Sequence, residues 1–348
     1  MGGKNLRIGI LGASGYTGAE LVRLLQDHSE ASIAWMTADR NAGQPIGALF
    51  PHLAHLNLPA LRRFEDVDPA AVDAVLCCLP HGLTQETIAA LPRGPKVVDL
   101  SADFRLRDSD LYARVYGGPH KALEVQKDAV YGLSEHYRSA VARSWLVANP
   151  GCYTTTAELP LVPLLAHEII DTRGIVIDAK SGVTGAGRAA REGSLHAEVS
   201  EGIHAYGVAT HRHGPEIEQC LADFAGRPVM VTFTPHLVPM NRGILATIYA
   251  RLADGASAMD AQRALQQAYA DEPFVRVLPL RSTPATRHVR GSNLCLIAVH
   301  PSRVPNEIIL LSVTDNLLKG ASGQALQNLN IMTGLDERMG LSQTPLFP

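Results

Sequence analysis

The sequence predicts a doubly wound α/β domain, followed by an α+β domain with a mainly antiparallel sheet. Apolar strand-like runs alternate with helical stretches over residues 6–100, which is typical of a parallel sheet with crossover helices. Beyond residue 152, strand-like runs stand among long polar loops instead. A chain of 348 residues, 46% of them hydrophobic, is also long enough to bury two cores.

The first half of the chain opens with an apolar run at residues 6–11, which predicts a buried strand. A glycine-rich turn at 12–18 and an amphipathic helix at 19–27 follow, as at the start of a βαβ unit. Further buried strands are predicted at residues 32–37, 74–79 and 96–100. Because such sheets bind ligands at the carboxyl ends of their strands, we look for binding residues there.

The second half of the chain has a different pattern of strand-like and helical segments, which indicates a separate domain. Strands are predicted at residues 175–179, 229–235, 243–250 and 294–300, and helices at 214–224 and 258–270. A last helix at 321–330 follows a loop at 315–320 and is expected to return to the first domain. We therefore expect a first domain of residues 1–148, joined by the C-terminal segment 316–348, and a second domain of residues 149–315.

Charge and cysteine content limit the class of partner. The chain has 31 Lys and Arg against 34 Asp and Glu, a formal net charge of −3, so we expect a small molecule rather than nucleic acid or a membrane surface. No apolar stretch approaches the roughly 20 residues of a membrane-spanning helix. The first apolar run is too short for a signal peptide, and the five cysteines lack metal or disulfide spacing. We expect a cytoplasmic protein without a metal site.

The glycine-rich turn, GASGYTG, follows a strand and opens a helix, which is the context of a dinucleotide site. Glycines let the backbone approach a pyrophosphate, and the free amides at the helix start stabilise its charge. The alternative is a tight turn with a structural task alone. The candidate cofactor-binding residues in this turn are Gly12, Ser14, Gly15, Tyr16, Thr17 and Gly18.

The residues after the second strand indicate which dinucleotide is bound. An acidic residue there holds the ribose 2′-hydroxyl of NAD, whereas basic and hydroxyl groups accommodate the 2′-phosphate of NADP. The chain offers both Asp39 and Arg40, beside Thr37. We expect NADP, with Arg40 and Thr37 at the 2′-phosphate; in the alternative, Arg40 is a solvated charge and Asp39 selects NAD.

The string Asn149-Pro-Gly-Cys152-Tyr indicates a nucleophile. A strand-like run at 145–148 enters a small-residue turn, and a helix is expected to begin near Cys152. The positive end of a helix favours a thiolate, the reactive form of cysteine. Backbone amides near Cys152, aided by Asn149, are expected to stabilise an oxyanion. The remaining cysteines are interpreted as packing residues: Cys77, Cys78, Cys220 and Cys295.

A cysteine nucleophile needs a proton carrier, and the segment His211-Arg-His213-Gly-Pro-Glu216 offers two imidazoles and a carboxylate. We expect His213 to carry the proton, with Glu216 orienting an imidazole in the preceding turn. His211 is the alternative carrier. Either histidine could also be a surface or packing residue.

Two clusters are candidates for holding an anionic substrate. Arg105 follows the end of a predicted strand, and Lys180 and Arg188 flank a loop rich in glycine and hydroxyl groups. Guanidinium, ammonium and backbone N–H groups bind carboxylates and phosphates. The alternatives are structural, for example an ion pair between Arg105 and Asp103.

Six motifs in this order closely resemble those of one known family. They are GASGYTG at 12–18, SADFRL at 101–106, NPGCY at 149–153, KSGVTGAGR at 180–188, HRHGPEI at 211–217 and DNLLKGASGQALQN at 315–328. Together they resemble the N-acetyl-γ-glutamyl-phosphate reductases of arginine biosynthesis, nearly end to end. One departure follows Cys152, where the family usually continues CYPTA. Here the chain has CYTTT, and Pro160 and Pro163 are expected to disturb the following helix because both lack an N–H donor.

The resemblance implies NADPH-dependent reduction of N-acetyl-γ-glutamyl phosphate to N-acetylglutamate 5-semialdehyde, through a thioester on Cys152. It implies a Rossmann-type domain, a catalytic domain similar to that of glyceraldehyde-phosphate dehydrogenase, and a homo-oligomer, either dimer or tetramer. Further implied cofactor contacts are Ser181, Gly182, Asn316 and Gly320. Alternatives that stay open are an aspartate-semialdehyde dehydrogenase, an N-acetyl-aminoadipyl phosphate reductase and, in a different class, a non-catalytic NADP-sensing regulator.

Overall fold

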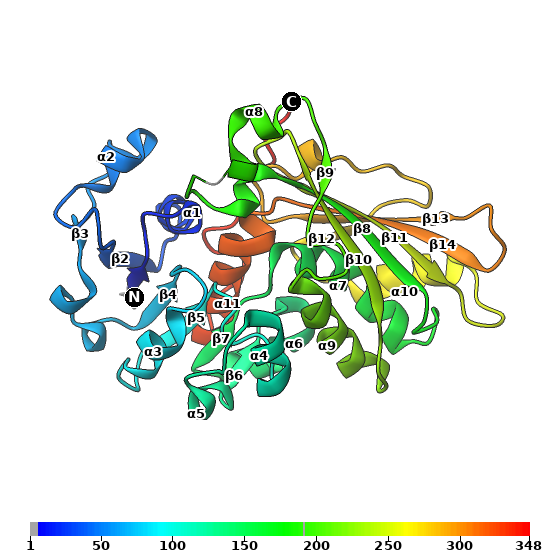
Figure 1. Ribbon diagram of the computed structural model, residues 1–348, viewed down its shortest axis with the longest axis horizontal. Helices are drawn as coiled ribbons and strands as arrows, with labels where there is room; N and C mark the ends of the chain where they lie inside the picture. The colour runs from blue at the N-terminus through cyan, green and yellow to red at the C-terminus, as the bar shows by residue number, and fades with distance from the viewer. Residues whose placement is uncertain (1–5, 191) are drawn as a thin grey trace. The chain divides into compact units, whose positions relative to one another are not determined.

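The computed structural model describes residues 6–190 and 192–348, which form two compact units (Figure 1). The first unit comprises Met1–Pro150 with Ala321–Ser342, and the second comprises Gly151–Gly320 with Gln343–Pro348. No helix among the described residues is long and apolar enough to cross a membrane.

The first unit is built on a seven-stranded sheet in the order β3-β2-β1-β4-β5-β7-β6, in which every pair is parallel. The strands are β1 (Leu6–Leu11), β2 (Ala31–Thr37), β3 (Leu61–Arg62), β4 (Ala74–Cys77), β5 (Lys96–Asp99), β6 (Ala129–Tyr131) and β7 (Leu146–Ala148). From β1 the chain extends the sheet to β2 and β3 on one side, and then to β4 and β5 on the other. The predicted doubly wound parallel sheet is confirmed.

Helices of the first unit connect these strands, and the last one comes from the far end of the chain. They are α1 (Tyr16–Leu25), α2 (Ile46–Leu49), α3 (Thr84–Ala89), α4 (Ser109–Tyr116), α5 (Leu123–Gln126), α6 (Ser134–Arg143) and α11 (Gly323–Thr333). Helix α1 starts three residues earlier than predicted, because Gly15 in an extended conformation serves as its N-cap. Helix α11 packs on α6 and β5, as expected for a returning C-terminal segment.

The second unit holds a mixed seven-stranded sheet in the order β12-β13-β14-β11-β8-β10-β9. The strands are β8 (Ile175–Gly182), β9 (His204–Ala205), β10 (Val231–Val238), β11 (Ile244–Arg251), β12 (Val275–Val277), β13 (Cys295–Pro301) and β14 (Glu307–Thr314). Four neighbouring pairs are antiparallel, whereas β8–β10 and β12–β13 are parallel, so the predicted mainly antiparallel sheet is confirmed.

Three helices, α7 (Cys152–Ala166), α9 (His213–Ala225) and α10 (Ala258–Ala268), accompany this sheet, with the short α8 (His196–Val199) in a long connection. Helix α7 contacts α9, α10, β11 and β14, which makes it the centre of the unit. Along β8 and β11, buried and partly exposed residues alternate, as expected for a sheet with one face on the core.

The two prolines predicted to disturb the helix after Cys152 lie inside α7, which continues through both. Pro163 removes the N–H that would bond to the Leu159 carbonyl, but the Tyr269 hydroxyl donates to that carbonyl instead. Residues 153–165 are all buried, so packing holds the helix on all sides. Tertiary contacts therefore compensate for the missing backbone donor.

Candidate active site

Cys152 is the first residue of α7 and follows the extended N-cap residue Gly151. The cysteine is partly exposed, and the positive end of a 15-residue helix favours its thiolate. Gly320 lies directly against it: a Cβ on this glycine would stand 2.8 Å from the Cys152 Cβ. The loop that carries Gly320 is therefore brought up to the candidate nucleophile, and only glycine fits there.

Glu216, in the first turn of α9, anchors the turn that leads into Cys152. Its Oε1 accepts a hydrogen bond from the Gly151 N–H at 2.8 Å and lies 3.0 Å from the Thr154 hydroxyl. The carboxylate is completely buried. The sequence motif predicted that Glu216 orients an imidazole. The hydrogen bond to Gly151 was not predicted, because the two residues lie 65 positions apart and no local pattern indicates the contact.

The two candidate proton carriers lie beside each other at the start of α9. Their ring centroids are 4.7 Å apart, and the backbone N–H of His213 donates to His211 Nδ1 at 3.1 Å. Both rings contact the ring of Tyr153, the residue after Cys152. The fold thus brings the cysteine segment and the two imidazoles together, as the sequence predicted.

The His211 imidazole stays neutral at physiological pH. Burial and the neighbouring Arg212 guanidinium lower its pKa to about 4, while Glu216 acts in the opposite direction. A neutral His211 that accepts a hydrogen bond from the backbone is suited to positioning. This environment supports His213 as the residue that exchanges protons.

Tyr153 and Tyr206 add two hydroxyl groups that sequence analysis did not single out. Tyr206 donates to the Tyr153 hydroxyl at 3.0 Å, and Tyr153 donates to the carbonyl of His236 at 3.1 Å. Burial raises the pKa of Tyr153 far above its usual range and that of Tyr206 to about 12, so both phenols stay protonated. The position of Tyr153 directly after Cys152 was the available signal.

Asn316, an implied cofactor contact, bonds at both ends of its amide within the second unit. Its Oδ1 accepts from the Gly243 N–H at 2.8 Å, and its Nδ2 donates to the Thr184 hydroxyl at 3.0 Å. Ser181 is buried and donates to the Gly182 carbonyl at 3.2 Å. These residues fix the loops near Gly320, and their contact with a cofactor stays a prediction.

Lys180 belongs to β8 rather than to a loop, because the strand extends through Gly182. Its ammonium lies 2.7 Å from the carboxylate of Asp178, which also lies 3.1 Å from His236 Nδ1. Arg188 is exposed on the following connection. Binding of the substrate by Lys180 and Arg188 stays a prediction.

The glycine turn of the first unit has the shape that a pyrophosphate needs. Gly12 has a φ of +77°, and a Cβ there would stand 2.8 Å from the Cys78 carbonyl oxygen. A Cβ on Gly18 would stand 2.6 Å from the Ala13 Cα. The side of Gly15 is open, with no neighbour nearer than 3.8 Å, and no side chain caps α1. The turn therefore fits a dinucleotide at the α1 amides.

Thr37 is buried and holds this turn. Its hydroxyl accepts from the Gly12 N–H at 3.2 Å, and its carbonyl accepts from the Ala13 N–H at 2.9 Å. The hydroxyl proton remains for another acceptor. Asp39 and Arg40 are exposed just beyond β2. The choice between them, and hence between NAD and NADP, stays a prediction from the sequence.

Arg105 and Asn149 are both buried in the first unit. The Arg105 guanidinium donates to the Leu100 carbonyl at 3.1 Å, and His81 Nδ1 lies 2.6 Å from Asp103 Oδ1. The Asn149 amide donates to the Ala321 carbonyl at 3.2 Å and accepts from Asn328 at 3.1 Å. An oxyanion role for Asn149 stays a prediction.

Comparisons with known proteins place this geometry in context. A family model described as the semialdehyde dehydrogenase NAD binding domain matches residues 7–144, and one described as the semialdehyde dehydrogenase dimerisation domain matches residues 152–316. The chain is 59% identical to the N-acetyl-gamma-glutamyl-phosphate reductase of Rhodospirillum rubrum, with 99% of both chains covered. It is 56% identical to a probable chloroplastic N-acetyl-gamma-glutamyl-phosphate reductase of Arabidopsis thaliana, over 99% of this chain and 86% of that one.

Solved structures of lower identity share the fold. Aspartate semialdehyde dehydrogenase II from Vibrio cholerae matches with a TM-score of 0.72 and 18% identity, over 95% of this chain and 99% of that one. Aspartate semialdehyde dehydrogenase with NADP from Candida albicans matches with a TM-score of 0.69 and 17% identity, over 94% and 98% of the two chains. These likenesses confirm the predicted combination of a dinucleotide-binding unit with a mixed-sheet unit.

Proposed function

The chain belongs to the N-acetyl-γ-glutamyl-phosphate reductase family, and we propose that it reduces N-acetyl-γ-glutamyl phosphate with NADPH to N-acetylglutamate 5-semialdehyde and phosphate. The observation that carries this proposal is Cys152 at the start of α7, in a segment that contacts two adjacent imidazoles through Tyr153. A partly exposed thiol at a helix N-terminus beside a histidine pair is suited to covalent catalysis.

In the proposed first step, the Cys152 thiolate attacks the acyl carbon of the substrate. A carbon–sulfur bond forms, the carbon–oxygen bond to phosphate breaks, and phosphate leaves with the electron pair. Amides at the start of α7 stabilise the negative charge on the carbonyl oxygen. The product of this step is a thioester on Cys152.

NADPH, when bound, would supply the hydride for reduction of the thioester carbonyl carbon. The resulting thiohemiacetal on Cys152 then expels the thiolate and releases the aldehyde. His213 moves the proton that this collapse requires. Neutral His211 positions His213 by accepting a hydrogen bond from the His213 backbone N–H.

The residues that would hold NADPH lie in the first unit, at the turn between β1 and α1 and after β2. We propose that Gly12, Gly15 and the α1 amides receive the pyrophosphate and that Arg40 faces the 2′-phosphate. On this proposal the first unit is the NADP-binding domain. The second unit is then the catalytic and oligomerisation domain of a homodimer or homotetramer, in agreement with the dimerisation model over residues 152–316.

Location in the cell also remains a proposal. We propose a cytoplasmic protein because all five cysteines are free thiols, which suits a reducing compartment. Plant relatives carry the word chloroplastic in their names.

The covalent step is tested by trapping. Incubation of the protein with N-acetyl-γ-glutamyl phosphate in the absence of NADPH is expected to add an N-acetylglutamyl group to the peptide that contains Cys152, as seen by mass spectrometry. Cys152→Ser is expected to bind NADPH normally but to lose at least about three orders of magnitude in turnover. Cys220→Ser, at a buried packing cysteine, is the matched control. Near-normal turnover in Cys152→Ser would overturn the proposed mechanism.

The substrate is tested in the reverse direction. Phosphate-dependent oxidation of N-acetylglutamate 5-semialdehyde is expected to exceed that of aspartate 4-semialdehyde and N-acetyl-aminoadipate semialdehyde. A preference for either of the other two aldehydes would leave the proposed reaction type in place but contradict the proposed substrate. If the protein kept its function after alkylation of Cys152, a non-catalytic NADP sensor would be favoured instead.

A further inference from the structure

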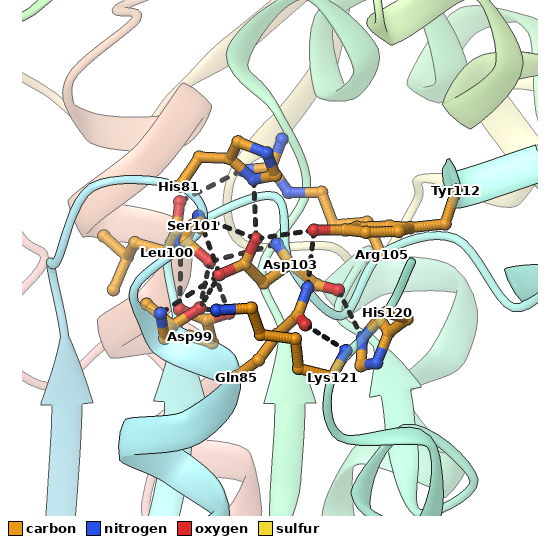
Figure 2. A network of polar contacts seen from close by, with 12 residues as sticks. His81, Gln85, Asp99, Leu100, Ser101, Asp103, Arg105, Tyr112, His120 and Lys121 are labelled. Carbon is orange, nitrogen blue, oxygen red and sulfur yellow. Dashed lines mark hydrogen bonds and ion pairs between the residues drawn. The ribbon is translucent and has the colours of Figure 1, made fainter. Parts of the chain in front are cut away.

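A buried polar network in the first unit takes no part in the mechanism above (Figure 2). Its centre is Asp103, whose carboxylate is fully buried at the carboxyl end of β5. Gly82 N–H donates to it at 3.0 Å, Thr84 N–H at 3.1 Å and the Tyr112 hydroxyl at 3.1 Å. Asp103 thus fixes the loop between β4 and α3.

His81 is the outward end of this network. Its Nδ1 lies 2.6 Å from Asp103 Oδ1. The His81 side chain is 26% exposed, whereas that of Asp103 is 0% exposed. The Tyr116 ring, with its centroid 4.3 Å away, supports the imidazole from the side. Figure 2 shows the imidazole directed at the carboxylate from above.

Asp103 is held by several groups besides His81. Burial alone would raise the pKa of Asp103, but the contacts with His81, Thr84 and Gly82 hold that pKa well below its usual range. The carboxylate also accepts hydrogen bonds from four other protein donors, which are the N–H groups of Gly82 and Thr84 and the hydroxyls of Thr84 and Tyr112. The imidazole is held with Nδ1 inward, and within the described residues no protein group bonds to Nε2.

The position of His81 in the sheet indicates what Nε2 faces. Strand order reverses between the neighbours β1 and β4, and open α/β sheets bind nucleotides at that point. The segments after these two strands touch there, since a Cβ on Gly12 would stand 2.8 Å from the Cys78 carbonyl oxygen. The half-sheet β1–β3 carries the glycine turn and Arg40. The half-sheet that begins with β4 carries His81 three residues after Cys78.

A dinucleotide spans both halves of such a sheet, one nucleotide over each. We propose that His81 binds the ribose and phosphate of the nicotinamide nucleotide through Nε2, and that Asp103 is a positioning residue for this contact. An imidazole can exchange a hydrogen bond with a ribose hydroxyl or donate one to a phosphate oxygen. This inference rests on the proposed dinucleotide site but goes beyond it, because it assigns the second nucleotide to a specific side chain.

The test compares a whole dinucleotide with half of one. Isothermal titration calorimetry of the full chain measures binding of NADP⁺ and of adenosine 2′,5′-bisphosphate, which lacks the nicotinamide nucleotide. His81→Ala is expected to weaken NADP⁺ binding by about tenfold or more, as for loss of one charge-assisted hydrogen bond. Its binding of the bisphosphate is expected to stay within about twofold of wild type.

His81→Gln keeps a polar group in place of Nε2 and guards against a folding defect in His81→Ala. It is expected to retain part of the NADP⁺ affinity. Asp103→Asn is expected to weaken the binding of NADP⁺ but not that of the bisphosphate, and by a smaller factor than His81→Ala does. His167→Ala, at an exposed histidine after α7 in the other unit, is the matched control and should bind both ligands as wild type does.

Unchanged NADP⁺ binding in both His81 variants would overturn the inference, and so would an equal loss for NADP⁺ and the bisphosphate. Neither result touches the proposed function, provided that the wild-type chain binds NADP⁺. Failure of wild type to bind NADP⁺ would overturn the dinucleotide site itself, and the inference with it.

Discussion

The environment of His211 bears on the choice between His213, the proton carrier that the sequence favoured, and His211, the alternative. His211 is half-buried, and desolvation together with the Arg212 guanidinium lowers its pKa to about 4, while its Nδ1 accepts a hydrogen bond from the His213 backbone N–H. An imidazole with so low a pKa does not change charge near neutral pH. The shape of the pH–rate profile near neutral pH is therefore expected to depend on groups other than His211.

Replacing each histidine tests this assignment. His213→Asn is expected to lower kcat by about two orders of magnitude or more and to remove the acidic limb of the kcat profile between pH 5 and 8, because the proton carrier is lost. His211→Asn is expected to lower kcat less and to leave the shape of the profile unchanged over that range. Loss of the limb in His211→Asn alone would exchange the two roles.

Glu216 shows how a correct residue can have an unexpected partner. The motif predicted a functional carboxylate near the histidines, and the structure places that carboxylate on the Gly151 N–H. A functional role for Glu216 could be predicted from a carboxylate at a helix start. Its hydrogen-bond partner could not be predicted, because the packing of α7 on α9 decides which backbone N–H lies within reach.

At the scale of the element, α7 is the main departure from expectation. Local rules predict disruption at Pro160 and Pro163, yet the helix is continuous. The carbonyl of Leu159, left without its helical donor, is satisfied by Tyr269 from the end of α10. The helix that begins with the candidate nucleophile is thus stabilised by a side chain that lies 110 residues away from Leu159 in sequence.

Tyr269→Phe removes this donor and leaves the buried Leu159 carbonyl unsatisfied. The free energy of unfolding is expected to fall by about 1–3 kcal/mol, the cost of one buried unpaired carbonyl. Urea denaturation followed by far-ultraviolet circular dichroism measures the change. Tyr249→Phe, at a partly exposed tyrosine in β11, is the control and should shift stability by less than about 0.5 kcal/mol. Equal effects in the two variants would contradict the role given to Tyr269.

At the scale of the whole molecule, the C-terminal segment completes the first unit. Asn328 in α11 is fully buried and donates to the Gly132 carbonyl at 2.7 Å and to Asn149 Oδ1 at 3.1 Å. It also accepts from the Ser134 hydroxyl at 2.8 Å. One side chain therefore binds three residues, in two segments, that lie between 179 and 196 residues away in sequence.

Asn328→Ala leaves several buried polar groups without their partner. We expect the first unit to lose about 3 kcal/mol of unfolding free energy. Trp35 and Trp145 both belong to that unit, so tryptophan fluorescence in urea reports its unfolding specifically. Asn57→Ala, at an exposed asparagine of the same unit, should change stability by less than about 0.5 kcal/mol. An Asn328→Ala variant as stable as this control would show that α11 is held by its apolar contacts alone.

The sequence by itself determined the class of fold, many of its elements and the segments that hold the candidate chemistry; strands such as β14 (Glu307–Thr314) were not predicted. Strand-length apolar runs, a glycine turn and Cys152 after a Pro-Gly pair are local signals, because each reflects the conformation of a few consecutive residues. The contacts of Glu216, Tyr269, Asn328 and His81 were decided by the tertiary structure alone. Each joins groups between 22 and 196 residues apart in sequence, and the packing of whole elements sets which donor meets which acceptor.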